Sequence, residues 1–129
     1  MQIEHAAIWT RDLERLRSFY ETVFGAQAGA EYRNPATGFH SRFLTFDGGA
    51  RLEIMSAPDV LPPAAGAAAR LSGYAHLAFA LGSREAVDRM AAGLRAAGVP
   101  VLDGPRTTGD GYYEAVFLDP DGNRVEITI

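Results

Sequence analysis

The chain has 129 residues, of which 47% are hydrophobic and 22% are charged, and this composition is typical of a folded globular protein. Its formal net charge is −4, and no run of basic residues offers the electrostatic surface needed to bind nucleic acid or an anionic membrane. The absence of cysteine excludes disulfides and thiolate ligands, so any metal ion would be held by nitrogen and oxygen.

The first residues, MQIEHAAIW, lack the basic and apolar regions of a signal peptide. The most apolar window, VLPPAAGAAA, is too short to span a bilayer. We therefore expect a cytoplasmic protein that works without a membrane.

The first half of the chain predicts a strand followed by a helix. Residues 3–10 alternate between side-chain types as a strand does, and residues 11–25 follow the helical period. Thr10 or Asp12 is the expected N-cap, and Gly25 is the expected stop. The apolar positions of the helix are Leu13, Leu16, Tyr20, Val23 and Phe24.

A short strand, a loop and a hairpin complete this half. The loop is YRNPATGFH, residues 32–40, and it contains His40, which we interpret as a loop histidine. The hairpin, residues 42–55, turns at DGG, where glycine tolerates a positive φ. Residues 57–73 are rich in Ala, Pro and Gly and are typical of a linker.

The second half repeats this order. Residues 74–81 predict a strand, and a helix follows with Ser83 as its N-cap and Gly98 as its stop. The loop GPRTTGDGY, residues 104–112, leads into a hairpin that turns at DPDGN. The apolar stripe of the helix is Val87, Met90, Ala91 and Leu94.

Each half therefore reads βαβββ, and the predicted fold class is α+β. Residues 1–129 form one domain of two tandem modules, residues 1–56 and residues 74–129. The repeat extends to short phrases, because GARLEI in the first half matches GNRVEI in the second.

Each module places one histidine and one glutamate about 50 residues apart: His5 with Glu53, and His76 with Glu126. Strand alternation puts Glu53, His76 and Glu126 on the face opposite the bulky aliphatic residues. One such residue alone is typical of a wet sheet face, but the joint recurrence favours a shared role. We predict that two modules pair and bring all four residues into one cup-shaped metal site.

Two imidazoles and two carboxylates suit one divalent ion per site, and Zn²⁺, Ni²⁺, Co²⁺, Mn²⁺ and Fe²⁺ all remain open. Four protein ligands leave room for a substrate that chelates through two adjacent oxygens. Either Glu126 or Glu53 is then the candidate base, unless both stay bound and a metal-bound water acts instead.

The predicted pocket wall is apolar and aromatic, although the same residues would also suit an ordinary core. The loop at 104–111 is a lid or a plain mobile connection, and its Arg106 is a candidate contact for an anionic substrate. The predicted wall residues are Trp9, Phe43, Met55, Tyr74 and Tyr112.

The paired modules resemble the vicinal oxygen chelate superfamily, which includes glyoxalase I, bleomycin-resistance proteins and extradiol dioxygenases. The stretches that carry this resemblance are HAAIWTRDLERLRSFYETVFG, YAHLAFAL and FLDPDGNRVEI. By resemblance to glyoxalase I, the metal ligands are His5, Glu53, His76 and Glu126, and Glu126 is the first candidate for the base. Glyoxalase I carries an arginine where this chain has Trp9, which argues against a glutathione adduct as substrate.

The resemblance implies a metal-dependent lyase or isomerase of glyoxalase type that acts on a small molecule. The alternatives are a metal-free protein that binds a drug or metabolite, as bleomycin-resistance proteins do, and an extradiol-type dioxygenase. We expect a homodimer with twofold symmetry. The modules would then pair either across the two chains or within one chain.

Overall fold

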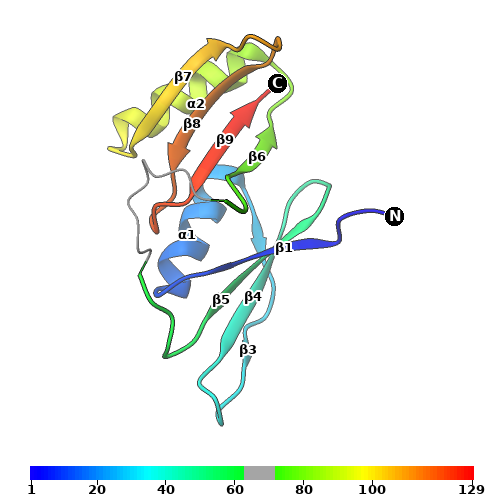
Figure 1. Ribbon diagram of the computed structural model, residues 1–129, viewed down its shortest axis with the longest axis vertical. Coiled ribbons are helices and arrows are strands. Elements are labelled where there is room, and N and C mark those ends of the chain that lie inside the picture. The colour runs from blue at the N-terminus through cyan, green and yellow to red at the C-terminus, as the bar shows by residue number, and fades with distance from the viewer. Residues whose placement is uncertain (63–71) are drawn as a thin grey trace. The chain divides into compact units, whose positions relative to one another are not determined.

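The computed structural model describes residues 1–62 and 72–129 and divides the chain into two compact units, Met1–Ala64 and Ala65–Ile129 (Figure 1). The predicted linker, residues 57–73, lies partly outside the described residues. No helix among the described residues is long and apolar enough to cross a membrane.

The first unit is a mixed sheet with one helix. Its sheet has the strand order β1-β5-β4-β2, and β3 also pairs with β4. β1 runs parallel to β5, and the remaining pairs are antiparallel. The elements are β1 (His5–Trp9), α1 (Leu13–Phe24), β2 (Gln27–Ala28), β3 (Tyr32–Arg33), β4 (His40–Thr45) and β5 (Arg51–Ser56).

The second unit repeats this topology without a counterpart of β3. Its sheet has the order β6-β9-β8-β7, with β6 parallel to β9 and the remaining pairs antiparallel. The elements are β6 (Leu77–Ala80), α2 (Arg84–Ala96), β7 (Val101–Thr107), β8 (Tyr113–Leu118) and β9 (Arg124–Thr128). The α+β class predicted from the sequence is confirmed. The second unit follows the predicted βαβββ order, whereas the first has two short strands, β2 and β3, where one was expected.

Both helices begin at side-chain caps that satisfy backbone N–H groups of the first turn. The Asp12 carboxylate accepts a hydrogen bond from the Arg15 N–H at 3.0 Å, and the Ser83 hydroxyl accepts one from the Ala86 N–H at 3.2 Å. α1 ends at Gly25, which has a φ of 65°, as the left-handed stop requires.

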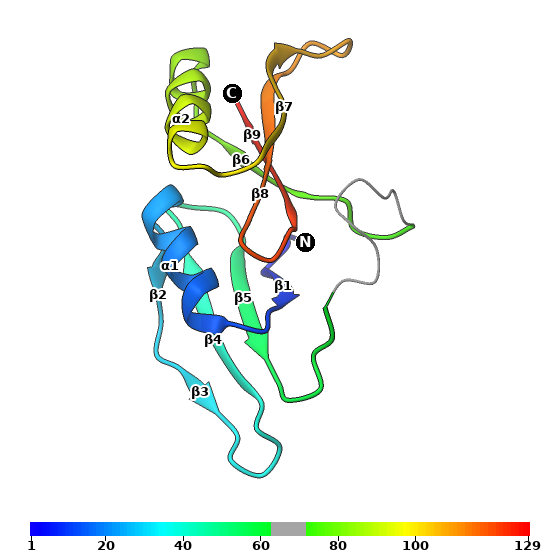
Figure 2. The ribbon, with the colours of Figure 1, turned by 90° about the vertical axis from the view of Figure 1, so that its left-hand side faces the viewer.

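Each helix packs against the sheet of its own unit (Figure 2). The apolar stripe of the helix meets the buried aliphatic side of the strands, so the helix leaves the opposite sheet face uncovered. The buried side chains of this core in the first unit are Leu13, Leu16, Tyr20, Leu44, Leu52 and Ile54. In the second unit they are Val87, Ala91, Leu94, Ala115, Phe117, Val125 and Ile127.

The predicted strand over 74–81 is wrong at its start, because β6 begins only at Leu77. In this register Arg124, the first residue of β9, stands opposite His76, and residues of the DPDGN turn stand opposite Tyr74 and Ala75, so the ladder cannot start at residue 74. His76 therefore immediately precedes the strand, and Tyr74 is fully exposed.

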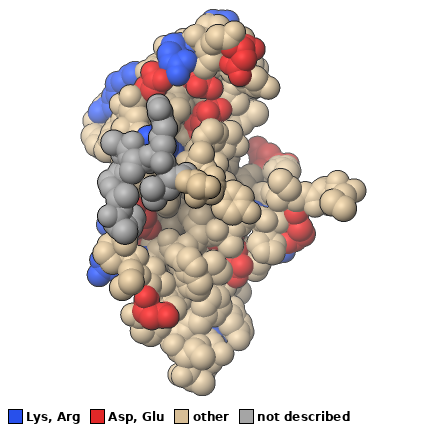
Figure 3. Space-filling view, in the orientation of Figure 1, with Lys and Arg blue, Asp and Glu red and all other residues tan. Residues whose placement is uncertain are grey.

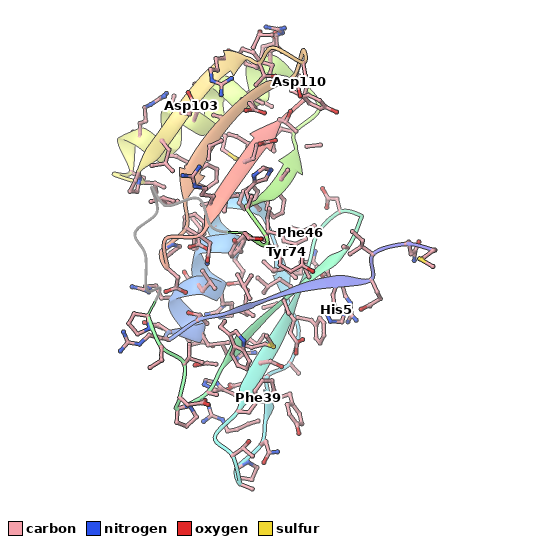
Figure 4. All side chains as sticks on the ribbon, in the orientation of Figure 1. His5, Phe39, Phe46, Tyr74, Asp103 and Asp110 are labelled. Carbon is pink, nitrogen blue, oxygen red and sulfur yellow. The ribbon has the colours of Figure 1, made fainter. Side chains whose placement is uncertain are left out.

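Both predicted loops are shorter than expected. Tyr32 and Arg33 pair with β4 as β3, and His40 begins β4, so the interpretation of His40 as a loop histidine is wrong. Residues 104–107 belong to β7, and only the residues after Thr107 form the turn that contains Asp110 (Figure 4). Gly and Pro fit inside β7 because its pairing with β8 is irregular there.

Candidate metal centre

The first histidine and glutamate are brought together by the parallel pairing of β1 with β5. Ala7 lies opposite Glu53 in this register, so His5, two residues before Ala7, projects from the same sheet face as Glu53. Figure 4 shows His5 on β1. The Nε2 atom of His5 lies 4.0 Å from the Oε2 atom of Glu53.

The second pair forms in the same way from β6 and β9. Ala78 lies opposite Glu126, and His76 stands two residues before Ala78 on the same face. The Nε2 atom of His76 lies 3.4 Å from the Oε2 atom of Glu126. The structure thus brings the four predicted residues together as two pairs, one in each unit.

The two pairs also have matching exposures. The side chains of His5 and His76 are each 41% exposed, whereas those of Glu53 and Glu126 are 17% and 15% exposed. In each unit a largely covered carboxylate therefore stands beside a partly exposed imidazole.

These distances suit two ligands of one ion. Ligands about 2.1 Å from an ion and about 90–110° apart lie about 3.0–3.4 Å from each other. The His76–Glu126 pair already has this spacing, and the His5–Glu53 pair would need to close by less than about 1 Å. Within the described ranges, no group of three or more such side chains gathers around one point.

The first histidine is also held from its far side. Its Nδ1 atom pairs with the carboxylate of Glu4, which in turn accepts a hydrogen bond from Arg51. The His5 contact, followed by the Arg51 contact, holds the pKa of Glu4 below its ordinary value. A carboxylate on Nδ1 leaves Nε2 facing Glu53 and is a common support for a metal-binding histidine.

Aromatic residues surround the first pair. Phe43 lies opposite Glu53 across β4 and β5, its ring meets His5 edge to face at 5.4 Å, and Arg51 stacks over it at 4.0 Å. Trp9 and Met55 share this face by register, and the Trp9 side chain is 51% exposed. Three of the predicted wall residues therefore lie on the same face as the pair.

Charged residues surround the second pair. Val116 lies opposite Glu126, so Glu114, two residues away on β8, shares the same face. Burial, followed by repulsion from Glu126, raises the pKa of Glu114. Arg106 lies 3.7 Å from Glu114 and 2.5 Å from Asp103, which Figure 4 shows on β7.

Glu114 was missed by the sequence reasoning. Alternation along YEAVFL would have placed it opposite the buried Ala115 and Phe117, but only the pairing of β8 with β9 brings it beside Glu126. Tyr74 and Tyr112, predicted for the pocket wall, are exposed residues outside the strands, and their role stays a prediction.

The charged side chains form no single-sign surface on the visible face of the second unit, because acidic and basic groups alternate there (Figure 3). This distribution agrees with a net charge of only −4. It favours a small ligand bound by individual side chains over a polyanion bound by a broad field.

The family comparison matches nearly the whole chain. The model of the glyoxalase/bleomycin resistance protein/dioxygenase superfamily matches residues 2–127. The chain belongs to this superfamily. Its members include enzymes and binding proteins, so membership alone does not decide the activity of this one.

Individual relatives agree with this membership. The uncharacterized protein YwkD of Bacillus subtilis is 30% identical over 128 residues, which cover 97% of this chain and 94% of that protein. A glyoxalase family protein from Enterococcus faecalis is 25% identical with a TM-score of 0.79, over 99% of this chain and 97% of that one.

The superfamily fold is also that of a known enzyme. The trypanothione-dependent glyoxalase I of Leishmania major has a TM-score of 0.78 and 22% identity, over 99% of this chain and 86% of that one. At this identity the likeness establishes the fold alone.

Proposed function

We propose that the protein is a metal-dependent enzyme of glyoxalase type, a lyase or isomerase that acts on a small molecule with two adjacent oxygens. The observation that carries this proposal is the doubled pair, in which histidine Nε2 faces glutamate Oε2 at 4.0 Å in one unit and 3.4 Å in the other. Surface composition gives no reason for the same pair to recur at equivalent places in two units.

The proposed ligands of one divalent ion are His5, Glu53, His76 and Glu126. The donor set fits, because imidazole nitrogen and carboxylate oxygen both bind borderline divalent ions and each pair has nearly the spacing of neighbouring ligands. When bound, such an ion supplies Lewis-acid stabilisation of negative charge on a substrate oxygen.

The proton transfer is assigned to the carboxylates of the chain. Glu126, or Glu53, would remove a proton from the carbon beside the substrate carbonyl and return it to a neighbouring atom. A positioned base of this kind contributes about 10²–10⁴-fold to the rate. Glu126 is the first candidate because it matches the base position of the glyoxalase I branch that the chain resembles, and it lies beside Glu114 on the same sheet face.

The side chains around the first pair indicate the kind of substrate. Trp9, Phe43 and Met55 offer apolar surface, and an indole has one N–H donor but no bidentate contact for a carboxylate. We therefore propose a substrate that is less charged than a glutathione adduct. Tyr74 and Tyr112 remain proposed contacts.

A homodimer would complete the site. Each unit supplies two ligands, so a full set takes one pair from each of two units. We propose that His5 and Glu53 of one chain meet His76 and Glu126 of its partner, with pairing inside one chain as the alternative. Light scattering at micromolar concentration tests this assembly, and a monomer would contradict it.

The experiment that tests the function is a measurement of metal content in the protein purified without added metal or chelator. We expect about one divalent ion per site by mass spectrometry, and we expect Glu126→Ala to lose it. A metal-free wild-type protein that cannot be loaded with Zn²⁺, Ni²⁺, Co²⁺, Mn²⁺ or Fe²⁺ would favour the second candidate, a binding protein for a drug or metabolite.

A further inference from the structure

A cavity of about 360 Å³ lies in the first unit, away from the histidine–glutamate pair. It opens where β5 ends and α1 begins, and Figure 2 shows these two ends at the same side of the unit. Its lining comes from the turn before α1, the start of β4 and the segment that follows β5. Small-molecule pockets are about 300–1,000 Å³, so this volume admits a compact metabolite.

Strand alternation separates this cavity from the candidate metal centre. His40 lies opposite Ser56 across β4 and β5, so both project from one sheet face. Ser56 is three residues after Glu53 and therefore points to the other face, the one that α1 covers. The cavity and the His5–Glu53 pair thus lie on opposite sides of the same sheet.

Polar groups capable of holding an anion line the cavity. Arg11 is exposed in the turn before α1, and it makes no ion pair within the described part of the chain. The Ser56 side chain is buried, and no hydrogen-bond partner for its hydroxyl is found among the described residues. A guanidinium and a hydroxyl with no partner within residues 1–62 and 72–129 are available to a ligand.

His40 is a third polar group that could hold an anion, and a contact with Glu31 orients its ring. Its Nδ1 atom lies 2.9 Å from the Glu31 carboxylate, which leaves Nε2 for the cavity. Protonated on both nitrogens, the ring donates from Nε2 to an oxyanion; protonated at Nδ1 alone, it accepts from an acidic hydroxyl. A phosphate group offers both kinds of oxygen, whereas a carboxylate at neutral pH offers only acceptors.

The nearby acids do not oppose this binding. Glu31 also pairs with Arg33 at 2.7 Å and Arg42 at 3.4 Å, so its charge is balanced. Asp12 and Asp59 neighbour lining residues in the chain but are exposed and are not part of the lining.

The other residues that line the cavity are mostly apolar and come from the loop before β4 and the segment after β5. Gly38 has a φ of 74°, and a Cβ atom there would lie 2.8 Å from the Pro58 ring, so the loop before β4 closes directly onto the segment after β5. Ala57, Pro58 and Val60 form the apolar side of the lining.

We propose that this cavity binds the phosphate group of a small phosphorylated metabolite. Arg11, His40 and Ser56 hold the phosphate oxygens, and the organic part lies against the apolar side. This site does not depend on the proposed enzymatic function, because none of its residues belongs to the candidate metal centre.

The test is a titration followed by two-dimensional ¹H–¹⁵N NMR on protein stripped of metal with a chelator, so that the metal centre cannot bind the probe. The probes are glycerol 3-phosphate, inorganic phosphate and acetate. We expect glycerol 3-phosphate to shift the amide signals of Gly38, Ala57 and Val60 and to bind more tightly than the other two.

Two variants decide whether the named side chains bind the probe. Arg11→Gln should weaken glycerol 3-phosphate about ten-fold or more, the typical effect of losing a hydrogen bond to a charged group. Ser56→Ala, which removes only the hydroxyl, should weaken it less. The matched control is Arg89→Gln, which removes the same charge from the exposed face of α2 and should leave binding unchanged.

Several outcomes would overturn the proposal. They are an absence of shifts at millimolar probe, equal weakening by Arg11→Gln and Arg89→Gln, acetate binding as tight as glycerol 3-phosphate, and inorganic phosphate binding as tight as the ester. The last of these would reduce the cavity to a site for an adventitious ion only.

Discussion

The two units share one topology apart from β3, but they differ in the side chains next to their histidine–glutamate pairs. Phe43 and Trp9 lie around the first pair together with the charged residues Glu4 and Arg51. Glu114 and Arg106 lie around the second pair. The helix caps and the parallel ladder recur because the fold of each unit depends on them. The histidine–glutamate pair recurs as well. The fold does not depend on the side chains next to the pair, so we expect these side chains to select the substrate.

The support of the two histidines differs as well. Glu4 holds His5 through its Nδ1 atom, whereas no equivalent partner of His76 is found among the described residues. One half of the proposed site is thus more firmly oriented than the other. The following predictions test how far the two units are equivalent.

The largest expected effect is a loss of folding stability when a side chain in either core is truncated. Leu16→Ala in the first unit and Phe117→Ala in the second each remove a side chain that is 0% exposed. Such truncations cost about 2–5 kcal/mol for leucine and about 3–5 kcal/mol for phenylalanine. Amide hydrogen exchange in the unit that carries the change measures the loss. A loss below about 1 kcal/mol in either unit would show that its core is not the one described.

The second prediction compares the two carboxylates of the proposed site. Glu53→Ala and Glu126→Ala should each weaken divalent-ion binding more than about 100-fold, because even partners outside the ligand shell contribute about 10–100-fold. Competition titration with a chromophoric chelator measures the affinity. Glu114→Ala, which removes a carboxylate from the same sheet face, is the control. Loss in only one of the two ligand variants would mean that only one unit binds the ion.

The third prediction concerns Trp9 and the apolar side of the first unit. Metal-loaded wild-type protein should turn over the methylglyoxal–glutathione hemithioacetal with kcat/KM below roughly 10⁴ M⁻¹s⁻¹, the lower end of the usual enzymatic range. Trp9→Arg should raise kcat/KM about ten-fold or more, because arginine supplies a charge-assisted bidentate contact to a carboxylate. Wild-type turnover above that range would identify an ordinary glyoxalase I.

The fourth prediction tests the unequal support of the histidines. Glu4→Gln should weaken divalent-ion binding about 10-fold, the lower end of the effect of losing a partner behind a metal-binding histidine. Glu85→Gln, at an exposed position in the first turn of α2, is the matched control. Identical affinities in the two variants would show that Glu4 does not orient His5.

The smallest expected effect is a pH dependence confined to the first unit. The hydrogen bond from His40, followed by contacts with Arg33 and Arg42, lowers the pKa of Glu31 from its ordinary value of 4.5. A carboxyl whose pKa is lowered by folding stabilises the protein above the unfolded value and loses this contribution as the pH falls below it. The melting temperature of wild-type protein should therefore fall more steeply below pH 4.5 than that of Glu31→Gln.

The control for this pH dependence is again Glu85→Gln, whose melting temperature should follow the wild-type curve. If Glu31→Gln and wild-type protein instead lose stability in parallel as the pH falls, the contacts of Glu31 do not contribute to folding. This outcome would also remove one support of His40 in the proposed phosphate cavity.

Local chemistry in the sequence determined the elements and the faces of their side chains. The cap at Ser83 and the stop at Gly25 were predicted, and Asp12 was one of two candidates for the first cap, because each acts within a few residues along the chain. Alternation likewise predicted that Glu53 and Glu126 face away from the buried aliphatic residues, since the strand period of two is independent of the partner.

Strand pairing, by contrast, was decided only by the tertiary structure. β7 extends through Gly104 and Pro105, residues that suggested a loop, because β8 provides an irregular partner for them. β6 begins late because β9 has no residues opposite its predicted start. In both cases the deciding residues lie on another strand.

The same distinction applies to the candidate sites. The sequence alone selected His5, Glu53, His76 and Glu126, because their recurrence is visible in one dimension. It could not place Glu114 beside Glu126, or Glu31 against His40, because these contacts depend on which strands are neighbours and in which register. The free energy that fixes a register comes from backbone ladders and core packing between distant segments, and this cooperative term is absent from any local stretch of sequence.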